Sequence, residues 1–355
     1  MPTAAPSTAA KHHSARRVAL NWISGAVVGT LLIGLTSPLF VRSYLPLEAD
    51  QRRGTWTLPA QQTYRWRSEG YTNTIVGPHG MPGRTDLPIS AHGKTQVALW
   101  GDSQTEGVAV SDHDKLFAQA DRVSIEKSTP MNVLPLTRSG EDAADWLTQM
   151  PRIESDWGID AHVILIVDLE DLKHATEAPL AAPSEADVAQ ANAAIARRLP
   201  AFVIQAARYL LTESDDVTRR KLRFSLGRVE AKSKPAPPSA EPPAFDWQPQ
   251  VDAIARTTRL PVLILYAPRV PSVVGGKVVK DDWQAEEFAR FQEAAASRGL
   301  TVIDVRDELR TSVEAGRWPH GFHNGQFGVG HLNAIGYQIV AQSLVDGVNK
   351  AVSKK

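Results

Sequence analysis

The chain has 355 residues, of which 43% are hydrophobic and 22% are charged, so it can bury a core of ordinary size in one or two domains. Lysine and arginine together number 39, as do aspartate and glutamate, and the resulting formal net charge of zero gives no support to nucleic-acid binding. Cysteine is absent, which excludes disulfides, thiol catalysis and cysteine-ligated metal sites.

A long uncharged stretch lies near the N-terminus. Residues 1–17 are small, polar and basic, which is typical of a disordered tail, and residues 18–41 carry no formal charge. A helix needs about 20 apolar residues to cross the hydrocarbon core of a bilayer. A cleaved signal peptide has a shorter apolar region and a small-residue cleavage site, and a buried core helix has a polar face. We therefore predict that residues 18–41 form an uncleaved, single-pass anchor in the lipid bilayer.

The charges that flank this segment say little about its orientation. Equal numbers of basic residues precede and follow it, namely Lys11, Arg16 and Arg17 before it and Arg42, Arg52 and Arg53 after it. The immediate flanks hold two arginines before the segment and one after it, which favours a cytoplasmic N-terminus under the positive-inside rule. We expect an inner-membrane protein whose main domain lies outside the cytoplasm, in the periplasm if the cell is Gram-negative.

The rest of the chain divides into a lead-in and one domain. Residues 42–95 are rich in glycine, proline, arginine and aromatic residues without a sustained period, so we predict a stalk and an irregular lead-in. Residues 96–350 alternate short apolar runs with amphipathic stretches, which predicts a parallel sheet with helices on both faces. The runs are 97–100, 131–136, 163–167, 262–266 and 301–305, and the predicted helices are 112–121, 141–150, 184–212, 282–298 and 332–350. The proline-rich residues 230–247 are expected to form an exposed loop within this domain.

The first apolar run leads directly into Gly101, Asp102 and Ser103. This places Ser103 at the carboxyl end of a strand, the edge where sites form in open α/β sheets. The glycine permits a tight turn from which the serine can project. Because Gly-Asp-Ser also makes ordinary turns, a catalytic interpretation needs a partner elsewhere in the chain.

A suitable partner stands before the last predicted helix, where residues 330–337 read GHLNAIGY. A serine nucleophile needs a base to take its proton, and histidine titrates in the right range. The long separation between Ser103 and His331 is no obstacle, because catalytic triads assemble in space. The alternative is that His331 is a capping or surface histidine.

Gly-Asp-Ser after the first strand, paired with His-x-Asn before the last helix, resembles the SGNH (GDSL) hydrolase superfamily over roughly residues 70–350. The lead-in TNTIVGPHGMPGR is similar to that of membrane-tethered members, which include polysaccharide O-acetyl esterases and acetyltransferases. The resemblance implies a flavodoxin-like, three-layer α/β/α fold with a mostly parallel five-stranded sheet, here preceded by one N-terminal transmembrane helix.

The resemblance also implies a role for each matching residue. Ser103 would be the nucleophile and His331 the general base, with Asp102 and Asn333 in supporting places. Gly140, in LTRSGEDAADWL, matches the glycine whose backbone N–H joins that of Ser103 in the oxyanion hole. No cofactor and no metal would be needed.

Two positions depart from the family pattern. Glu170 stands where the family has an asparagine that donates to the oxyanion, and an ionised carboxylate only accepts hydrogen bonds. Gly328 stands where the family has an aspartate that orients the histidine. A Ser103–His331 dyad, a backbone carbonyl or another carboxylate remain open as alternatives. Asp304 and Asp307 are candidates, although solvation and helix capping are the favoured interpretation of both.

Other residues are weaker candidates. His320 and His323 precede His331 on a predicted loop and could line a cleft or bind a metal with it, but no nearby carboxylate completes a recognisable metal pattern. The tryptophans beyond the anchor could include platforms that stack on sugars, although core or interface positions are favoured for most; they are Trp56, Trp66, Trp146, Trp157, Trp247, Trp283 and Trp318.

The resemblance therefore favours a serine esterase that acts on an acylated carbohydrate or another small ester, with O-acetyl groups of a cell-surface polysaccharide as the expected substrate. No residue separates an esterase from an O-acetyltransferase that uses the same dyad. The departures at Glu170 and Gly328 favour a second interpretation, a catalytically inactive SGNH-fold domain that binds a glycan or a partner in an envelope assembly. A lipase that acts on the surrounding membrane has little support, because the sequence has no long apolar lid.

Overall fold

The computed structural model describes residues 15–86, 93–179, 203 and 244–353. Its main sheet has the strand order β11-β8-β7-β5-β6, and every neighbouring pair is parallel. The strands are β5 (Thr95–Trp100), β6 (Met131–Pro135), β7 (Ala161–Ile166), β8 (Val262–Tyr266) and β11 (Thr301–Asp304). All five coincide with the predicted apolar runs, and in chain order they give the flavodoxin-like arrangement 2-1-3-4-5. The predicted fold class is confirmed.

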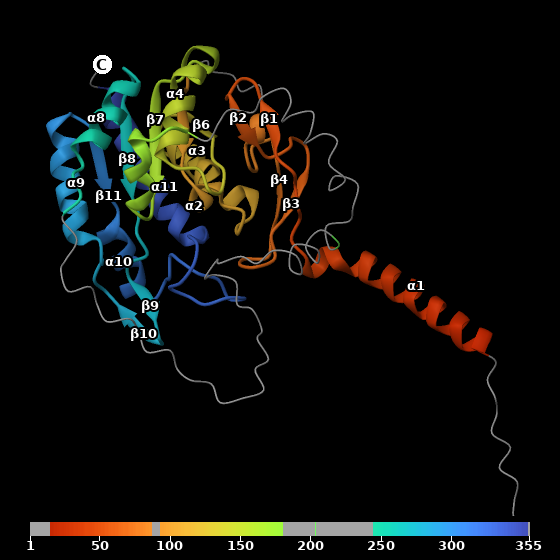
Figure 1. The fold of residues 1–355 in the computed structure, drawn as a ribbon. Helices are drawn as coiled ribbons and strands as arrows, with labels where there is room; N and C mark the ends of the chain where they lie inside the picture. The colour runs from red at the N-terminus through yellow and green to blue at the C-terminus, as the bar shows by residue number, and fades with distance from the viewer. Residues whose placement is uncertain (1–14, 87–92, 180–202, 204–243, 354–355) are drawn as a thin grey trace, which may run out of the picture.

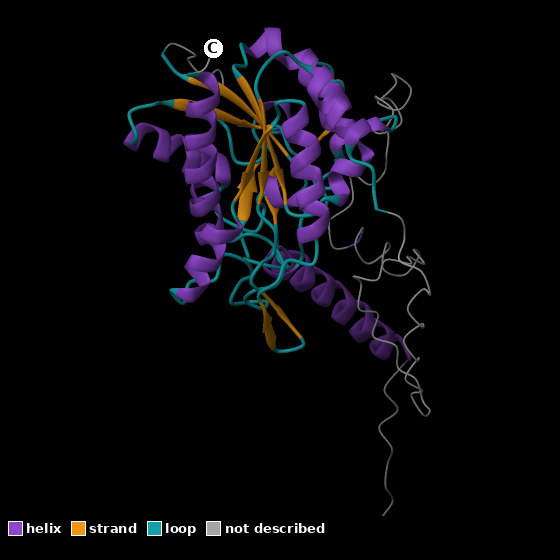
Figure 2. Cartoon of the chain, turned by 90° about the vertical axis from the view of Figure 1, so that its left-hand side faces the viewer, coloured by secondary structure: helices purple, strands orange, loops and turns teal. Residues whose placement is uncertain are grey.

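Helices cover both faces of this sheet (Figure 2). They are α3 (Leu116–Glu126), α4 (Ala143–Trp157), α8 (Gln248–Thr257), α9 (Ala285–Ser297), α10 (Arg306–Glu314) and α11 (Ala334–Val352). Side chains alternate between the faces along each strand. Val97 and Leu99 pack on one side in a core shared with α3 and α11, and Ala98 and Trp100 pack on the other in a core shared with α4, α8 and α9. The strands read as continuous apolar runs because both faces are buried.

The predicted helices match the structure unevenly. The stretch 112–121 becomes a 3₁₀ turn, η2 (Asp112–Asp114), followed by α3. The predicted helix 184–212 lies outside the described residues apart from position 203, and of the predicted loop 230–247 only residues 244–247 are described. The sequence did not predict α8, α10 or the hairpin of β9 (Ser272–Val274) and β10 (Lys277–Val279), because such short segments show too few turns of a period.

Residues 42–86 pack on the domain, where the sequence predicted a stalk and an irregular lead-in. They form two antiparallel hairpins, β1 (Glu48–Asp50) with β2 (Thr55–Thr57) and β3 (Thr63–Arg65) with β4 (Asn73–Ile75). Arg53 is fully buried and donates from Nε to Gln149 Oε1 of α4 at 2.9 Å. Three-residue strands carry no visible alternation in sequence, which is why this packing was missed.

The helix α1 (Ala15–Phe40) projects away from the domain (Figure 1). Its most apolar window has a mean hydropathy of 1.8 and none of it is buried, so the helix is long and apolar enough to cross a membrane; a signal sequence passes the same test. The carboxyl end of α1 contacts the loop between β3 and β4. Arg67 Nε donates to the carbonyl of Pro38 at 3.0 Å, and the Tyr71 hydroxyl donates to the carbonyl of Leu39.

Candidate active site

Ser103 begins a single-turn helix, α2 (Ser103–Glu106), immediately after β5. The chain enters this turn through Gly101, whose φ is +151°, and a Cβ there would lie 1.9 Å from Thr105 Oγ1. Asp102 caps the turn, since its Oδ1 accepts from the N–H of Gln104 at 2.9 Å. The Gly-Asp-Ser sequence is therefore required locally: glycine makes the turn and aspartate fixes the helix that presents the serine.

The structure brings His331 to this serine. His331 Nε2 lies 3.1 Å from Ser103 Oγ, within hydrogen-bonding distance. Gln104 joins the two chain segments, because its Oε1 accepts from the N–H of Leu332 at 3.0 Å and its backbone carbonyl accepts from the Tyr337 hydroxyl at 2.6 Å. The loop that carries the histidine is thus bonded directly to the turn that carries the serine.

Asn333 holds the histidine loop from the other side. Its Oδ1 accepts from two backbone N–H groups in the first turn of α11, at 3.0 and 3.2 Å. Its Nδ2 donates to the carbonyls of Trp318 and Gly321 at 2.8 and 3.0 Å. The asparagine of the His-x-Asn sequence therefore caps the helix and anchors the preceding loop at the same time.

A carboxylate from the lead-in completes the arrangement. Glu69 Oε2 lies 2.8 Å from His331 Nδ1 and also accepts from the His331 backbone N–H at 3.1 Å. An acceptor at Nδ1 keeps the ring proton on that nitrogen, which leaves Nε2 free to accept from the Ser103 hydroxyl. Glu69, His331 and Ser103 therefore have the geometry of a carboxylate–histidine–serine triad.

The pKa of Glu69 is consistent with this pairing. Burial raises it, but the hydrogen bonds and positive charge of His331, with a smaller contribution from the charge of Arg269, bring the pKa below its usual value. Glu69 thus remains ionised at neutral pH and can stabilise a protonated His331.

The loop 66–72, between β3 and β4, presents this carboxylate. The N–H of Gly70 donates to Asn324 Oδ1 at 2.9 Å, which ties the loop to the segment before His331. Gly330 has a φ of +94°, and a Cβ there would lie 2.6 Å from Glu69 Oε1. A larger residue before the histidine would therefore push the carboxylate away.

Sequence reasoning missed Glu69, and its own candidates for the orienting group lie elsewhere. Asp304 pairs with Arg306 at 2.7 Å and Asp307 pairs with Arg310 at 2.8 Å, so both carboxylates have arginine partners on α10. The one signal for Glu69 is that it is the sole carboxylate in the loop 66–72. That signal does not distinguish it from an ordinary turn residue.

The two expected oxyanion donors are the backbone N–H groups of Ser103 and Gly140. Among the described residues neither group donates to a partner, so both are available to a ligand. Gly140 lies in the turn before α4 with a φ of +84°. Its neighbour Glu141 is buried and lies 3.5 Å from Arg138 Nε and 3.7 Å from Arg53 Nη2, which ties this turn to the lead-in.

Glu170 does not oppose charge at this site. Its side chain is 62% exposed and pairs with Lys173 at 3.0 Å. The next residue, Asp171, is half-buried, and burial together with three neighbouring aspartates raises its pKa to about 7. The carboxylate of Glu170, which occupies the position of the family's asparagine, thus faces solvent.

Among the described residues, the side chains of the other two histidines of this loop make no hydrogen bond with Ser103, His331 or Glu69. His320 is fully buried, and burial lowers its pKa to about 3, so its ring is neutral at physiological pH. His323 is exposed. In the described part of the chain, no group of three or more histidine, aspartate or glutamate side chains is arranged to hold a metal ion.

Replacing Tyr337 by phenylalanine should weaken the link between α11 and the serine turn. Tyr337 is fully buried, and its hydroxyl donates to the Gln104 carbonyl at 2.6 Å. We expect the free energy of unfolding to fall by about 1–2 kcal/mol, because a buried carbonyl loses its partner. We also expect kcat to fall more than KM changes, since the serine and the histidine lose a common anchor. Urea unfolding and ester kinetics measure both effects, and an unchanged kcat would contradict the positioning role.

No family model matches the chain, and no curated protein matches it. Several solved structures are distantly similar to it. A lipase/acylhydrolase from Enterococcus faecalis is 14% identical, with a TM-score of 0.37 over 72% of this chain and 96% of that one. The acetyl xylan esterase AlAXEase is 12% identical, with a TM-score of 0.37 over 71% of this chain and 99% of that one. A putative lipolytic protein of the G-D-S-L family from Desulfitobacterium hafniense DCB-2 is 11% identical, with a TM-score of 0.34 over 71% and 99%. At these TM-scores the likenesses carry no argument about fold or function. The strand order, taken by itself, is the flavodoxin-like order that the sequence resemblance implied.

Proposed function

We propose that the chain is a serine hydrolase of the SGNH type that cleaves acyl esters. The observation that carries the proposal is the line of contacts from Ser103 Oγ to His331 Nε2, at 3.1 Å, and from His331 Nδ1 to Glu69, at 2.8 Å. Each member has the partner that its role requires: the nucleophile has a base, and the base has a carboxylate that orients it.

The chemistry follows from these contacts. His331 accepts the hydroxyl proton as Ser103 Oγ attacks the acyl carbonyl, and Glu69 stabilises the imidazolium that forms. The backbone N–H groups of Ser103 and Gly140 receive the oxyanion of the tetrahedral intermediate. His331 then gives its proton to the leaving alkoxide, and an acyl-enzyme remains. Water then attacks the acyl-enzyme with His331 as its base, which releases the acid and restores Ser103.

Asp102 supports this arrangement without taking the proton. Its Oδ2 lies 3.2 Å from Ser103 Oγ, close to the distance between that oxygen and His331. The hydroxyl has one proton and can donate it to one acceptor at a time. Attack requires the orientation toward His331, so we assign Asp102 the role of helix cap.

Two departures from the family pattern, at Gly328 and Glu170, favoured an inactive domain, and the contacts of the site argue against that interpretation. Glu69 takes the place of the aspartate that Gly328 replaces, because it bonds the same ring nitrogen of the histidine. Glu170 is largely exposed and ion-paired. Hydrolysis is therefore the better-supported function, and an O-acetyltransferase would differ only in using a sugar hydroxyl in place of water.

We further propose that α1 is retained as a membrane anchor, with the catalytic domain outside the cytoplasm and the O-acetyl groups of a surface polysaccharide as substrate. The contacts of Arg67 with Pro38 and of Tyr71 with Leu39 support retention, because removal of α1 would break both. They also lie in the loop that presents Glu69, so the end of the anchor helps to hold the triad.

The proposal is tested by assaying the full-length chain, purified in detergent, against 4-nitrophenyl esters of increasing acyl length and against O-acetylated oligosaccharides. The Ser103→Ala variant serves as the blank. We expect turnover above this blank, highest for acetyl esters. Equal rates for the two proteins on every substrate would contradict the proposal.

A further inference from the structure

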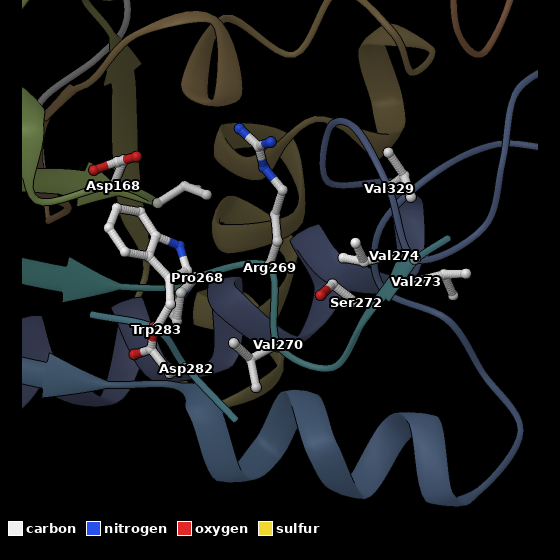
Figure 3. Close-up of a pocket in the computed structure, with 12 residues that line it drawn as sticks. Asp168, Pro268, Arg269, Val270, Ser272, Val273, Val274, Asp282, Trp283 and Val329 are labelled. Atoms are coloured by element: carbon white, nitrogen blue, oxygen red, sulfur yellow. The ribbon is translucent and has the colours of Figure 1, made fainter. Parts of the chain in front are cut away.

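A pocket opens between the ends of β7 and β8 and the loop that precedes His331, with a volume of about 320 Å³. In Figure 3 the Arg269 side chain rises between Trp283 and Asp168 on one side and valines of the β9 strand and the histidine loop on the other. Pockets that bind small molecules begin at about this size. The space suits one sugar unit with its bound water better than a long acyl chain.

The pocket adjoins the triad. Gly328 and Val329 form part of its wall and stand just before His331 in the chain. The charge of Arg269 also acts on Glu69, where it helps to lower the pKa of that carboxyl. The loop that carries His331 and the charge of Arg269 therefore connect this pocket with the triad.

Arg269 is the available cation of this pocket. Its side chain is exposed, and within the described residues it makes no hydrogen bond and no ion pair. Arg306, which lies nearby, is by contrast fully engaged: it donates to Asp304 at 2.9 Å and to Asp282 at 3.2 Å. Because Asp282 is already paired with Arg306, it does not cancel the charge of Arg269.

The opposite wall has the features of a sugar platform. Trp283 is 81% exposed, although it lines a pocket, and its broad indole face can stack on a sugar ring. Asp168 lies beside it in Figure 3; its Oδ1 accepts from Gln284 Nε2 at 2.7 Å, while its Oδ2 makes no hydrogen bond within the described residues. A carboxylate oxygen in this position can accept from sugar hydroxyls.

We propose that this pocket is a subsite for a sugar unit that carries a carboxylate, next to the esterified unit at Ser103. The ring packs on Trp283, a hydroxyl donates to Asp168, and the carboxylate pairs with the fork of Arg269. The inference rests on the proposed ester hydrolysis and adds the substrate class: acetylated polymers that contain uronic acids. A neutral glycan would leave Arg269 without a partner.

The test compares two O-acetylated substrates, oligogalacturonate and xylo-oligosaccharide, with the full-length chain in detergent. We expect the wild type to favour the uronate in kcat/KM, and Arg269→Gln to reduce that preference by about 10- to 100-fold, as for loss of one charge-assisted pair. The preference should also weaken as salt is raised. Arg259→Gln is the matched control. Arg259 is an exposed arginine that precedes the amino end of β8, whereas Arg269 follows its carboxyl end, so this variant should keep the preference. A wild type that treats both substrates alike, or an equal loss for both in Arg269→Gln, would overturn the proposal.

A binding measurement separates this inference from the ester chemistry. Calorimetry of the Ser103→Ala variant with oligogalacturonate that lacks acetyl groups should show binding, which is lost when Arg269→Gln or Trp283→Ala is added. Binding without turnover of any ester would remove the proposed hydrolysis and keep the subsite. Turnover of 4-nitrophenyl acetate without binding of oligogalacturonate would remove the subsite and keep the hydrolysis.

Discussion

Replacing Glu69 by glutamine is expected to lower kcat for ester hydrolysis by about 10⁴-fold, with KM changed by a few-fold at most, as for the loss of the orienting carboxylate of a serine triad. The glutamine fills the same space, but its amide can donate to His331 Nδ1. That bond would place the ring proton on Nε2, the nitrogen that must accept from Ser103. Steady-state kinetics at pH 7 to 8 measures the effect.

Glu170→Gln is the matched control for this variant. Glu170 occupies the position that the family resemblance connects with the oxyanion hole, yet its side chain is 62% exposed and paired with Lys173. We expect its kcat to stay within about twofold of the wild type, since exposed ion pairs contribute little. If Glu170→Gln were the more damaging of the two changes, the assignment of Glu69 would be wrong.

The difference in stability between the wild type and Glu69→Gln should depend on pH. The folded pKa of Glu69 lies below its ordinary value of 4.5, so its contribution to stability is present above that value and is lost as the pH falls through the folded pKa. Wild type should therefore be more stable than Glu69→Gln at pH 7, and the difference should disappear in strongly acid solution. Thermal unfolding across this range measures it, and a difference that grows toward acid pH would contradict the pairing.

Replacing His331 by alanine should lower kcat by about 10⁶-fold, and Ser103→Ala should have a similar effect. The two residues act in one step, because the base serves no purpose without its nucleophile. The double variant should therefore be no slower than either single variant. His113→Ala is a suitable control, since that side chain is 76% exposed on the surface. Additive losses in the double variant would mean that the two residues act separately.

The fold was predictable because its information is local. Each strand of the main sheet is a short apolar run buried on both faces, and each large helix after it has a clear amphipathic period. The small hairpins of residues 42–86 were not predictable, because three-residue strands show no alternation. Their burial depends on tertiary contacts such as that of Arg53 with Gln149.

The site likewise has residues that local sequence predicts and one residue that it does not. Ser103 and His331 stand in recognisable local sequences, Gly-Asp-Ser and His-x-Asn, whose turn and cap residues the structure explains. Glu69 stands in no such sequence and reaches the histidine across 262 positions of chain. Only the packing of the β3–β4 hairpin against the histidine loop brings it there, so neither periodicity nor spacing could reveal it.

Covalent labelling tests the central claim, an activated Ser103, most directly. The full-length chain is treated with a fluorophosphonate, which phosphonylates serines that a nearby base activates, and the product is mapped by peptide mass spectrometry. We expect one adduct, on the peptide that contains Ser103, formed far more slowly in His331→Ala and Glu69→Gln and absent in Ser103→Ala. An intact protein that acquires no adduct, or acquires it on another residue at a rate independent of His331, would contradict the account.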